Sequence, residues 1–82
     1  MHFGRALRRR REERGLSQEE LAGRADSSTV YISALERGLY NPTIGVVFEL
    51  ARALEIQPID LIKDIPSGAR VEGPKGRPAR RR

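Results

Sequence analysis

The chain has 82 residues, a net charge of +5 and no cysteine. This length suits one small domain, and the lack of cysteine excludes a disulfide framework and a thiolate metal site. No apolar run approaches the roughly 20 residues that cross a bilayer, and the basic start is not followed by the apolar core of a secretory signal, so we expect an intracellular protein without membrane contact.

The positive charge is concentrated at one end of the chain. Residues 66–82 carry six basic side chains and one acidic side chain, so residues 1–65 are neutral overall. Because glycine, proline and arginine dominate residues 66–82, we expect a folded domain over 1–65 and a disordered basic tail over 66–82. Such a polarised charge is typical of proteins that bind nucleic acid. A general abundance of arginine in the source proteome is the alternative explanation.

The first two helices are predicted from an apolar stripe and from their end signals. A helix over residues 3–14 would stop at Gly15. The next helix begins at Ser17, whose hydroxyl can accept from the Glu20 amide while the Glu20 carboxylate reaches back to the Ser17 amide. This reciprocal cap fixes the start of the second helix, which buries Leu21 and its neighbours.

The third predicted helix follows after a short turn. Residues 25–28 read Ala-Asp-Ser-Ser, which suits a tight turn and a fresh helix cap. The helix over residues 28–37 carries an apolar stripe through Ile32 and Leu35 and stops at Gly38. Two short helices joined by such a turn form a helix-turn-helix, whose second helix is built to lie in the DNA major groove.

Two further helices complete an all-α domain. Pro42 interrupts the chain, and Thr43 can cap a helix over residues 43–54. Pro58 opens a short fifth helix that continues through Ile62. No β-type alternation is long enough to build a sheet. The apolar stripe of the fourth helix comprises Ile44, Val47, Leu50, Ala51 and Leu54.

The order of these features resembles the phage-repressor-like (Cro/Xre-type) helix-turn-helix family over residues 3–62, about three quarters of the chain. The matching blocks are Gly15-Leu16-Ser17-Gln18, Glu20-Leu21-Ala22, Tyr31-Ile32-Ser33, Leu35-Glu36-Arg37-Gly38, Asn41-Pro42 and Leu50-Ala51-Arg52-Ala53-Leu54. Each block is weak alone, whereas all of them in order are specific. The resemblance implies a compact five-helix lambda-repressor-like DNA-binding domain.

Some positions depart from the family pattern. Arg10 stands on the stripe of the first helix where the family usually has leucine or isoleucine, so its stem would cover the core edge. Asp26 and Glu55 occupy positions that glycine often holds, and aspartate tolerates the left-handed conformation well. Gly45 inside the fourth helix is expected to cost up to about 1 kcal/mol relative to alanine.

The resemblance also implies which side chains would contact DNA. The base-reading positions are Thr29, Val30, Ser33 and Ala34, and the phosphate-binding positions are Gln18, Ser28, Arg37, Tyr40 and Asn41. The base-reading set has no arginine, glutamine or asparagine, so we expect its methyl groups to meet thymine methyls. Specificity from DNA shape or from other arginines is the alternative. Gln18 as a solvated side chain and Arg37 as a complement to the helix dipole are the alternatives for the phosphate set.

Two further groups of residues are implied by the resemblance. Arg11 and Glu36 match a charge pair that ties the first helix to the third. The family pairs through its last two helices and their connection, and this region is rich in apolar residues. We therefore expect a homodimer on a pseudo-palindromic operator. The predicted interface comprises Phe48, Ile56, Ile59 and Ile62.

These features predict a sequence-specific, dimeric transcriptional repressor or autoregulator of double-stranded DNA, cytoplasmic and associated with the nucleoid. The antitoxin of a toxin–antitoxin pair and the controller protein of a restriction–modification operon are alternatives. We expect no catalytic residue, metal or cofactor, because the chain has no cysteine, a lone histidine and no phosphate loop. We also expect no small-molecule effector, because no sensor domain remains outside the helices.

Overall fold

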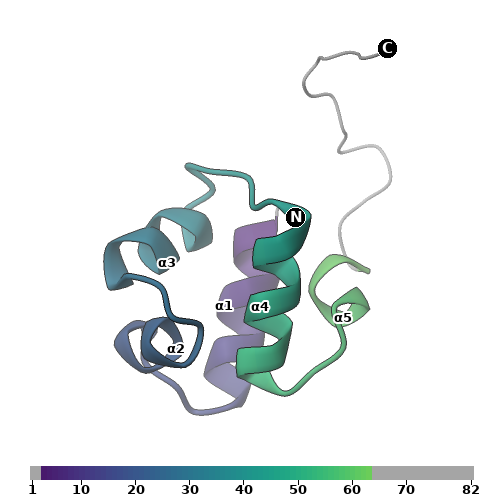
Figure 1. Ribbon diagram of the computed structural model, residues 1–82, viewed down its shortest axis with the longest axis horizontal. Coiled ribbons are helices and arrows are strands. Elements are labelled where there is room, and N and C mark those ends of the chain that lie inside the picture. Colours follow the sequence, from purple (N-terminus) through teal and green to yellow (C-terminus); the bar gives the residue numbers. More distant parts are fainter. Residues whose placement is uncertain (1–2, 64–82) are drawn as a thin grey trace.

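The computed structural model describes residues 3–63, and these residues form five helices and no strand. The helices are α1 (Phe3–Glu13), α2 (Gln18–Arg24), α3 (Thr29–Glu36), α4 (Ile44–Leu54) and α5 (Ile59–Ile62) (Figure 1). The predicted all-α, five-helix architecture is confirmed, and the observed bounds lie within a few residues of the predicted ones. The predicted tail over 66–82, and with it the boundary after residue 65, lies outside the described residues.

Three helices begin at hydroxyl caps, as the sequence predicted. The Ser17 hydroxyl accepts from the Glu20 amide at 3.0 Å, and the Glu20 carboxylate accepts from the Ser17 amide at 2.7 Å. Ser28 and Thr43 cap α3 and α4 in the same way, at 3.0 and 3.1 Å. The backbone hydrogen bond from Ser17 holds the pKa of Glu20 below its usual value, because it stabilises the charged carboxylate.

Four helices end with one residue in the left-handed conformation. The φ angles are 69° at Gly15, 55° at Asp26, 79° at Gly38 and 61° at Glu55. After each of them, the next amide donates to the carbonyl oxygen five residues back, at 2.8 to 3.1 Å. This is the Schellman motif, which satisfies helix carbonyl groups that lack intrahelical partners. Asp26 and Glu55 therefore take the conformation that glycine usually supplies.

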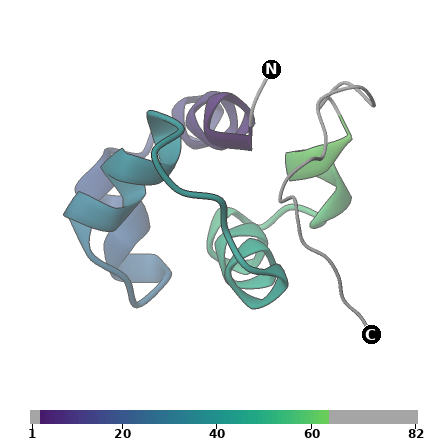
Figure 2. The same ribbon diagram turned by 90° about the horizontal axis from the view of Figure 1, so that it is seen from above.

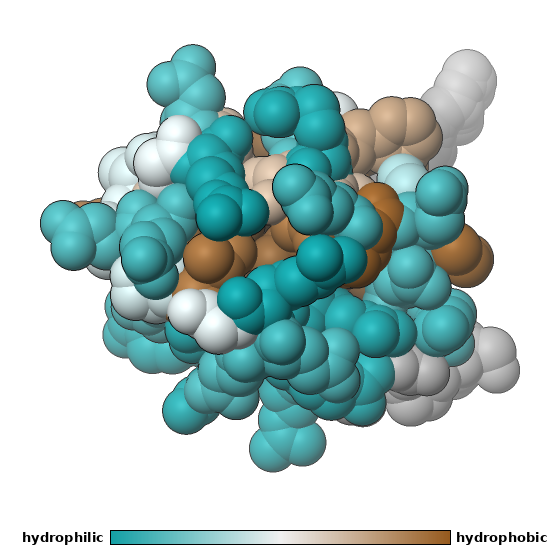
Figure 3. Space-filling model, turned by 90° about the horizontal axis from the view of Figure 1, so that it is seen from below, coloured by the Kyte–Doolittle hydropathy of each residue, from teal (hydrophilic) through white to brown (hydrophobic). Residues whose placement is uncertain are grey.

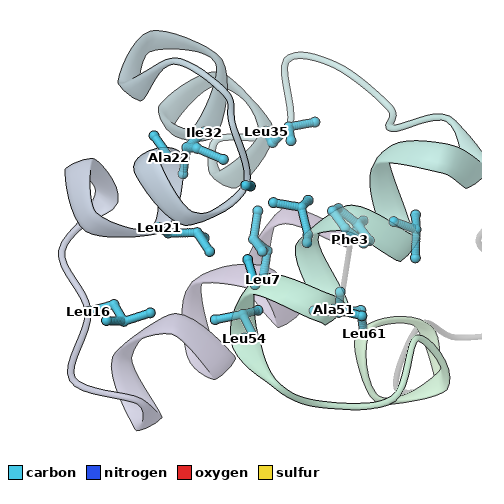
Figure 4. Packing of buried hydrophobic residues seen from close by; sticks show 14 residues of the cluster. Phe3, Leu7, Leu16, Leu21, Ala22, Ile32, Leu35, Ala51, Leu54 and Leu61 are labelled. Atoms are coloured by element: carbon cyan, nitrogen blue, oxygen red, sulfur yellow. The ribbon is translucent and has the colours of Figure 1, made fainter.

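The helices surround one small apolar core (Figures 1 and 2). α1 and α4 overlap in Figure 1, but Figure 2 separates them, so they form opposite walls of the domain. α2 and α3 close one side, and α5 closes the other. The core is drawn close up in Figure 4. Its largest fully buried side chains are Leu7, Leu21, Ile32, Leu35, Leu50, Leu54 and Leu61.

A glycine lets α1 approach the end of α3. A Cβ added at Gly4 would overlap the carbonyl oxygen of Leu35 and lie 2.7 Å from that of Glu36. No other residue type leaves room for this backbone contact. The orientation of α3 on the domain therefore depends on a glycine that the helix pattern alone did not single out.

Two expectations about exposed positions have different outcomes. The side chain of Arg10 is 21% exposed, and its Nη1 donates to Glu13 at 3.3 Å, so most of the side chain is withdrawn from water and its end is paired with an acid. Ile44 is 75% exposed, although it falls on the apolar stripe predicted for α4. It is the first residue of α4, and the first buried residue of this helix is Val47.

Candidate nucleic-acid interface

The outer face of α3 carries three of the four predicted base-reading residues. Thr29 and Val30 are exposed at the start of the helix, and Ser33 is half-buried one turn later. Val30 is 78% exposed, so its whole side chain is available to a partner. Residues three or four apart share a helix face, so these side chains form one outward surface.

Ala34 is not part of that surface. It is only 4% exposed, and the amide of Leu39 donates to its carbonyl oxygen at 2.9 Å. The prediction that Ala34 faces base edges is therefore wrong, because its side chain offers almost no surface to a base.

Ser28, Arg37, Tyr40 and Asn41, four of the predicted phosphate ligands, border this surface and are exposed. The Ser28 oxygen already accepts from the Tyr31 amide, which leaves its hydroxyl proton available to an anion. The Tyr40 ring stacks on Tyr31, with 6.1 Å between ring centroids and 26° between planes, so the loop after α3 is held against the helix. Arg37 forms no ion pair with any residue from 3 to 63.

The fifth predicted ligand, Gln18, takes part in a buried polar network. Arg11 donates to both carboxylate oxygens of Glu36, from Nε at 2.6 Å and from Nη2 at 3.0 Å, and its Nη1 donates to the Leu16 carbonyl oxygen at 2.7 Å. The Gln18 amide donates to the same carboxylate at 3.0 Å. The sequence indicated the pair of Arg11 and Glu36, but not that Gln18 and the Leu16 carbonyl join it.

This network fixes α1, the start of α2 and the end of α3 relative to one another. The side chains of Arg11 and Glu36 are only 11% and 3% exposed. The hydrogen bond to Glu36 raises the pKa of Arg11 above its usual value despite the opposing effect of burial, so Arg11 stays charged. The Gln18 amide nitrogen carries a second proton besides the one it donates to Glu36.

A separate apolar surface lies on α4 and α5. Phe48, Ile59 and Ile62 are 59%, 54% and 43% exposed. Ile56, the fourth residue of the predicted dimer interface, is half-buried and packs against the core, so its main contact is internal. Figure 3 shows apolar residues reaching the surface of the lower face, in a band between hydrophilic ones and on the side where α5 lies.

A surface hollow of about 390 Å³ opens between α4 and the turn that joins α2 to α3. The hollow is lined by Ala25, Asp26, Ser27, Tyr31, Val46, Glu49 and Leu50.

No helix among residues 3–63 is long and apolar enough to cross a membrane. Within the same range, no group of three histidine, cysteine or acidic residues is placed to hold a metal ion.

Comparison with known proteins gives one consistent result. The family model described as Helix-turn-helix matches residues 7–61. An HTH-type transcriptional regulator of Sinorhizobium fredii is 43% identical over 65 residues, which is 76% of this chain and 84% of that protein. Some other curated relatives are longer, and the chain spans 46% of one and 29% of another.

Solved structures agree with this match. The restriction–modification controller protein C.AhdI from Aeromonas hydrophila is 41% identical, with a TM-score of 0.70, and the similarity covers 72% of this chain and 89% of that one. The P22 c2 repressor, solved in complex with a synthetic operator, is 30% identical with a TM-score of 0.70, over 77% of this chain and 96% of that one.

Proposed function

Because the chain belongs to the helix-turn-helix family of DNA-binding transcriptional regulators, we propose that it binds one specific double-stranded sequence with α3 in the major groove and represses transcription from that site. The observation that carries this proposal is the outward face of α3, where Thr29 and the 78% exposed Val30 stand clear of the core. A helix start that projects exposed side chains fits the major groove, whose width admits an α-helix.

Phosphate contacts would fix the position of the domain on the duplex. Ser28, Arg37, Tyr40 and Asn41 border the exposed face of α3, and the second N–H of the Gln18 amide lies at the start of α2. Such contacts orient a protein without reading sequence. The stacked pair of Tyr31 and Tyr40 supports this role, since it holds the loop that carries two of these ligands.

We also propose that the protein acts as a homodimer through α4 and α5. The support is the exposed apolar surface formed by Phe48, Ile59 and Ile62, which a small monomer would otherwise leave in water. Two-fold symmetry would place the half-sites about one turn of DNA, roughly 34 Å, apart. Sedimentation should show a dimer, and Ile62→Glu should convert it to a monomer. A monomer both free and on DNA would contradict this part of the proposal.

The controller protein of a restriction–modification operon is a second candidate, supported by the 41% identity to C.AhdI. It would bind DNA in the same way and regulate its own operon. The antitoxin alternative predicts a stable complex with the product of a neighbouring gene, which co-purification would reveal. In each case we propose a cytoplasmic, nucleoid-associated protein without enzymatic activity, cofactor or small-molecule effector.

Selection of bound sites from random DNA tests the main proposal. The purified protein should enrich one pseudo-palindromic sequence, and Val30→Arg should abolish its enrichment without lowering the melting temperature. Ile44→Arg is the matched control, because it changes an equally exposed aliphatic residue on another helix. Enrichment of no sequence, or the same sequence with Val30→Arg, would contradict the placement of α3.

A further inference from the structure

The segment that joins α3 to α4 is held by hydrogen bonds at both ends but not in its middle. At its start the Leu39 amide is bonded to the end of α3, and at its end Thr43 caps α4. Between these points, residues 40–42 form no hydrogen bond or ion pair with any residue from 3 to 63. Two of the proposed phosphate ligands, Tyr40 and Asn41, lie in this unbonded stretch.

The covalent structure fixes only part of the stretch. The ring of Pro42 locks its own φ angle and restricts Asn41 to extended conformations. Neither restriction reaches Tyr40, whose backbone would otherwise sample several conformations. Within the described part of the chain, Tyr40 is held by its ring stack on Tyr31, with 6.1 Å between the centroids and 26° between the planes. The stack therefore sets the conformation in the middle of the loop.

Tyr31 can support Tyr40 because the core holds Tyr31 in place. Tyr31 is half-buried and packs against the core, whereas Tyr40 is 59% exposed. The Tyr31 hydroxyl forms no hydrogen bond with any residue from 3 to 63, so the ring alone makes the contact. The exposed face of α3 is carried by the two preceding residues, Thr29 and Val30. Tyr31 thus connects the core to the loop rather than to that face.

Resting on the proposed DNA-binding function, we propose that Tyr31 is a positioning residue whose ring holds Tyr40 and Asn41 in the conformation that binds DNA phosphate groups. The loop is then ordered when the domain folds, and binding does not have to order it. Phosphate contacts carry no sequence information. Tyr31 therefore raises the affinity for operator and for random DNA by the same factor, and it leaves the selected sequence unchanged.

The first experiment measures how tightly the full chain binds its selected operator and random DNA, well below the melting temperature. Tyr31→Leu keeps an apolar side chain on the core but removes the ring. It should weaken binding to both DNAs about three- to tenfold per half-site, the range that a stacked ring pair contributes. Tyr31→Phe keeps the ring and should bind like wild type. Val46→Ala is the matched control and should also bind like wild type, because Val46 is half-buried against the core and lines the same hollow as Tyr31.

A double-mutant cycle shows whether Tyr31 acts through Tyr40. In a Tyr40→Ala background, Tyr31→Leu should weaken binding less than about 1.5-fold, because the ring that Tyr31 supports is already absent. A loss as large as in the wild-type background would reveal general destabilisation and overturn the inference. A change in the selected sequence with Tyr31→Leu would overturn it as well, because Tyr31 would then act through α3.

Substitutions at Tyr40 give a second arm that does not depend on the stability of Tyr31→Leu. Tyr40→Phe loses only the hydroxyl group, whereas Tyr40→Leu loses the hydroxyl group and the stacked ring. Tyr40→Leu should therefore bind both DNAs about three- to tenfold more weakly per half-site than Tyr40→Phe. If wild type selects a site but these two variants bind it equally well, the inference is wrong while the proposed function stands. If wild type selects no site, the proposed function itself fails.

Discussion

The tetrapeptide Glu-Arg-Gly-Leu occurs twice in the described domain, at residues 13–16 after α1 and at residues 36–39 after α3. The backbone is nearly the same in both copies: the glycines have φ angles of 69° and 79°, and both leucine amides donate five residues back. The burial of the glutamate and the leucine is reversed between the copies, whereas both arginines are exposed. Glu13 is exposed and Leu16 buried in the first copy, whereas Glu36 is buried and Leu39 exposed in the second.

The contrast teaches which interactions are local. Glycine permits the left-handed turn wherever it stands, so identical sequences end their helices identically. Whether a side chain is buried depends on what packs beside it. α1 presses on the end of α3 at Gly4, and Arg11 meets Glu36 there. Leu39, by contrast, remains 60% exposed after the end of α3.

The two glutamates should give the largest difference. Glu36→Gln leaves the Arg11 charge buried with a weaker acceptor and should lower the free energy of unfolding by about 3–5 kcal/mol. Glu13→Gln removes only an exposed ion pair with Arg10 and should cost less than about 1 kcal/mol. Urea unfolding followed by circular dichroism measures both. Equal losses would mean that the two copies do not differ as the burial indicates.

For the two leucines the order of the stability losses should be reversed: the substitution in the first copy should cost more than the one in the second. Leu16→Ala creates a cavity at the core edge and should cost about 2–3 kcal/mol. Leu39→Ala should change stability by less than about 0.5 kcal/mol, since the side chain is exposed. Thermal melting provides the comparison. A Leu39 variant as unstable as the Leu16 variant would show that Leu39 is a core residue rather than a surface one.

The contact of α1 with the second copy can be tested at Gly4. Gly4→Ala forces a methyl group against the Leu35 and Glu36 carbonyls and should destabilise the domain by about 1–3 kcal/mol. Gly45→Ala is the control, since its added methyl would lie no nearer than 3.9 Å to the Thr43 hydroxyl. It should stabilise the domain by up to about 1 kcal/mol. Chemical denaturation should therefore give opposite signs for the two substitutions.

The smallest expected difference is between the two turn glycines. Gly15→Ala and Gly38→Ala should each cost about 1–2 kcal/mol, because alanine disfavours the left-handed conformation equally in both copies. Gly23→Ala, inside α2 with open space around it, should instead be neutral or stabilising. If the two turn variants differ by more than about 1 kcal/mol in urea unfolding, the helix ends are not the independent local motifs described above.

The sequence by itself determined the local features of this protein. The Ser17–Glu20 cap, the stops at Gly15 and Gly38, the five helices and the helix-turn-helix order were all predicted, and the structure and the family comparisons confirm them. These features could be predicted because each depends on residues within one or two helical turns. The left-handed conformation at Asp26 is also a local feature, and it could be predicted from the turn sequence.

Only the tertiary structure decided which side chains reach the surface. In the folded domain Ala34 is buried, whereas Leu39 and Ile44 are exposed. Ile56 packs against the core, and Gln18 donates to Glu36, the partner of Arg11. Helical periodicity places residues on a face, but it does not say which segment covers that face. The two copies of Glu-Arg-Gly-Leu give the physical reason: burial is a property of contacts between distant segments, and identical local sequences have different distant neighbours.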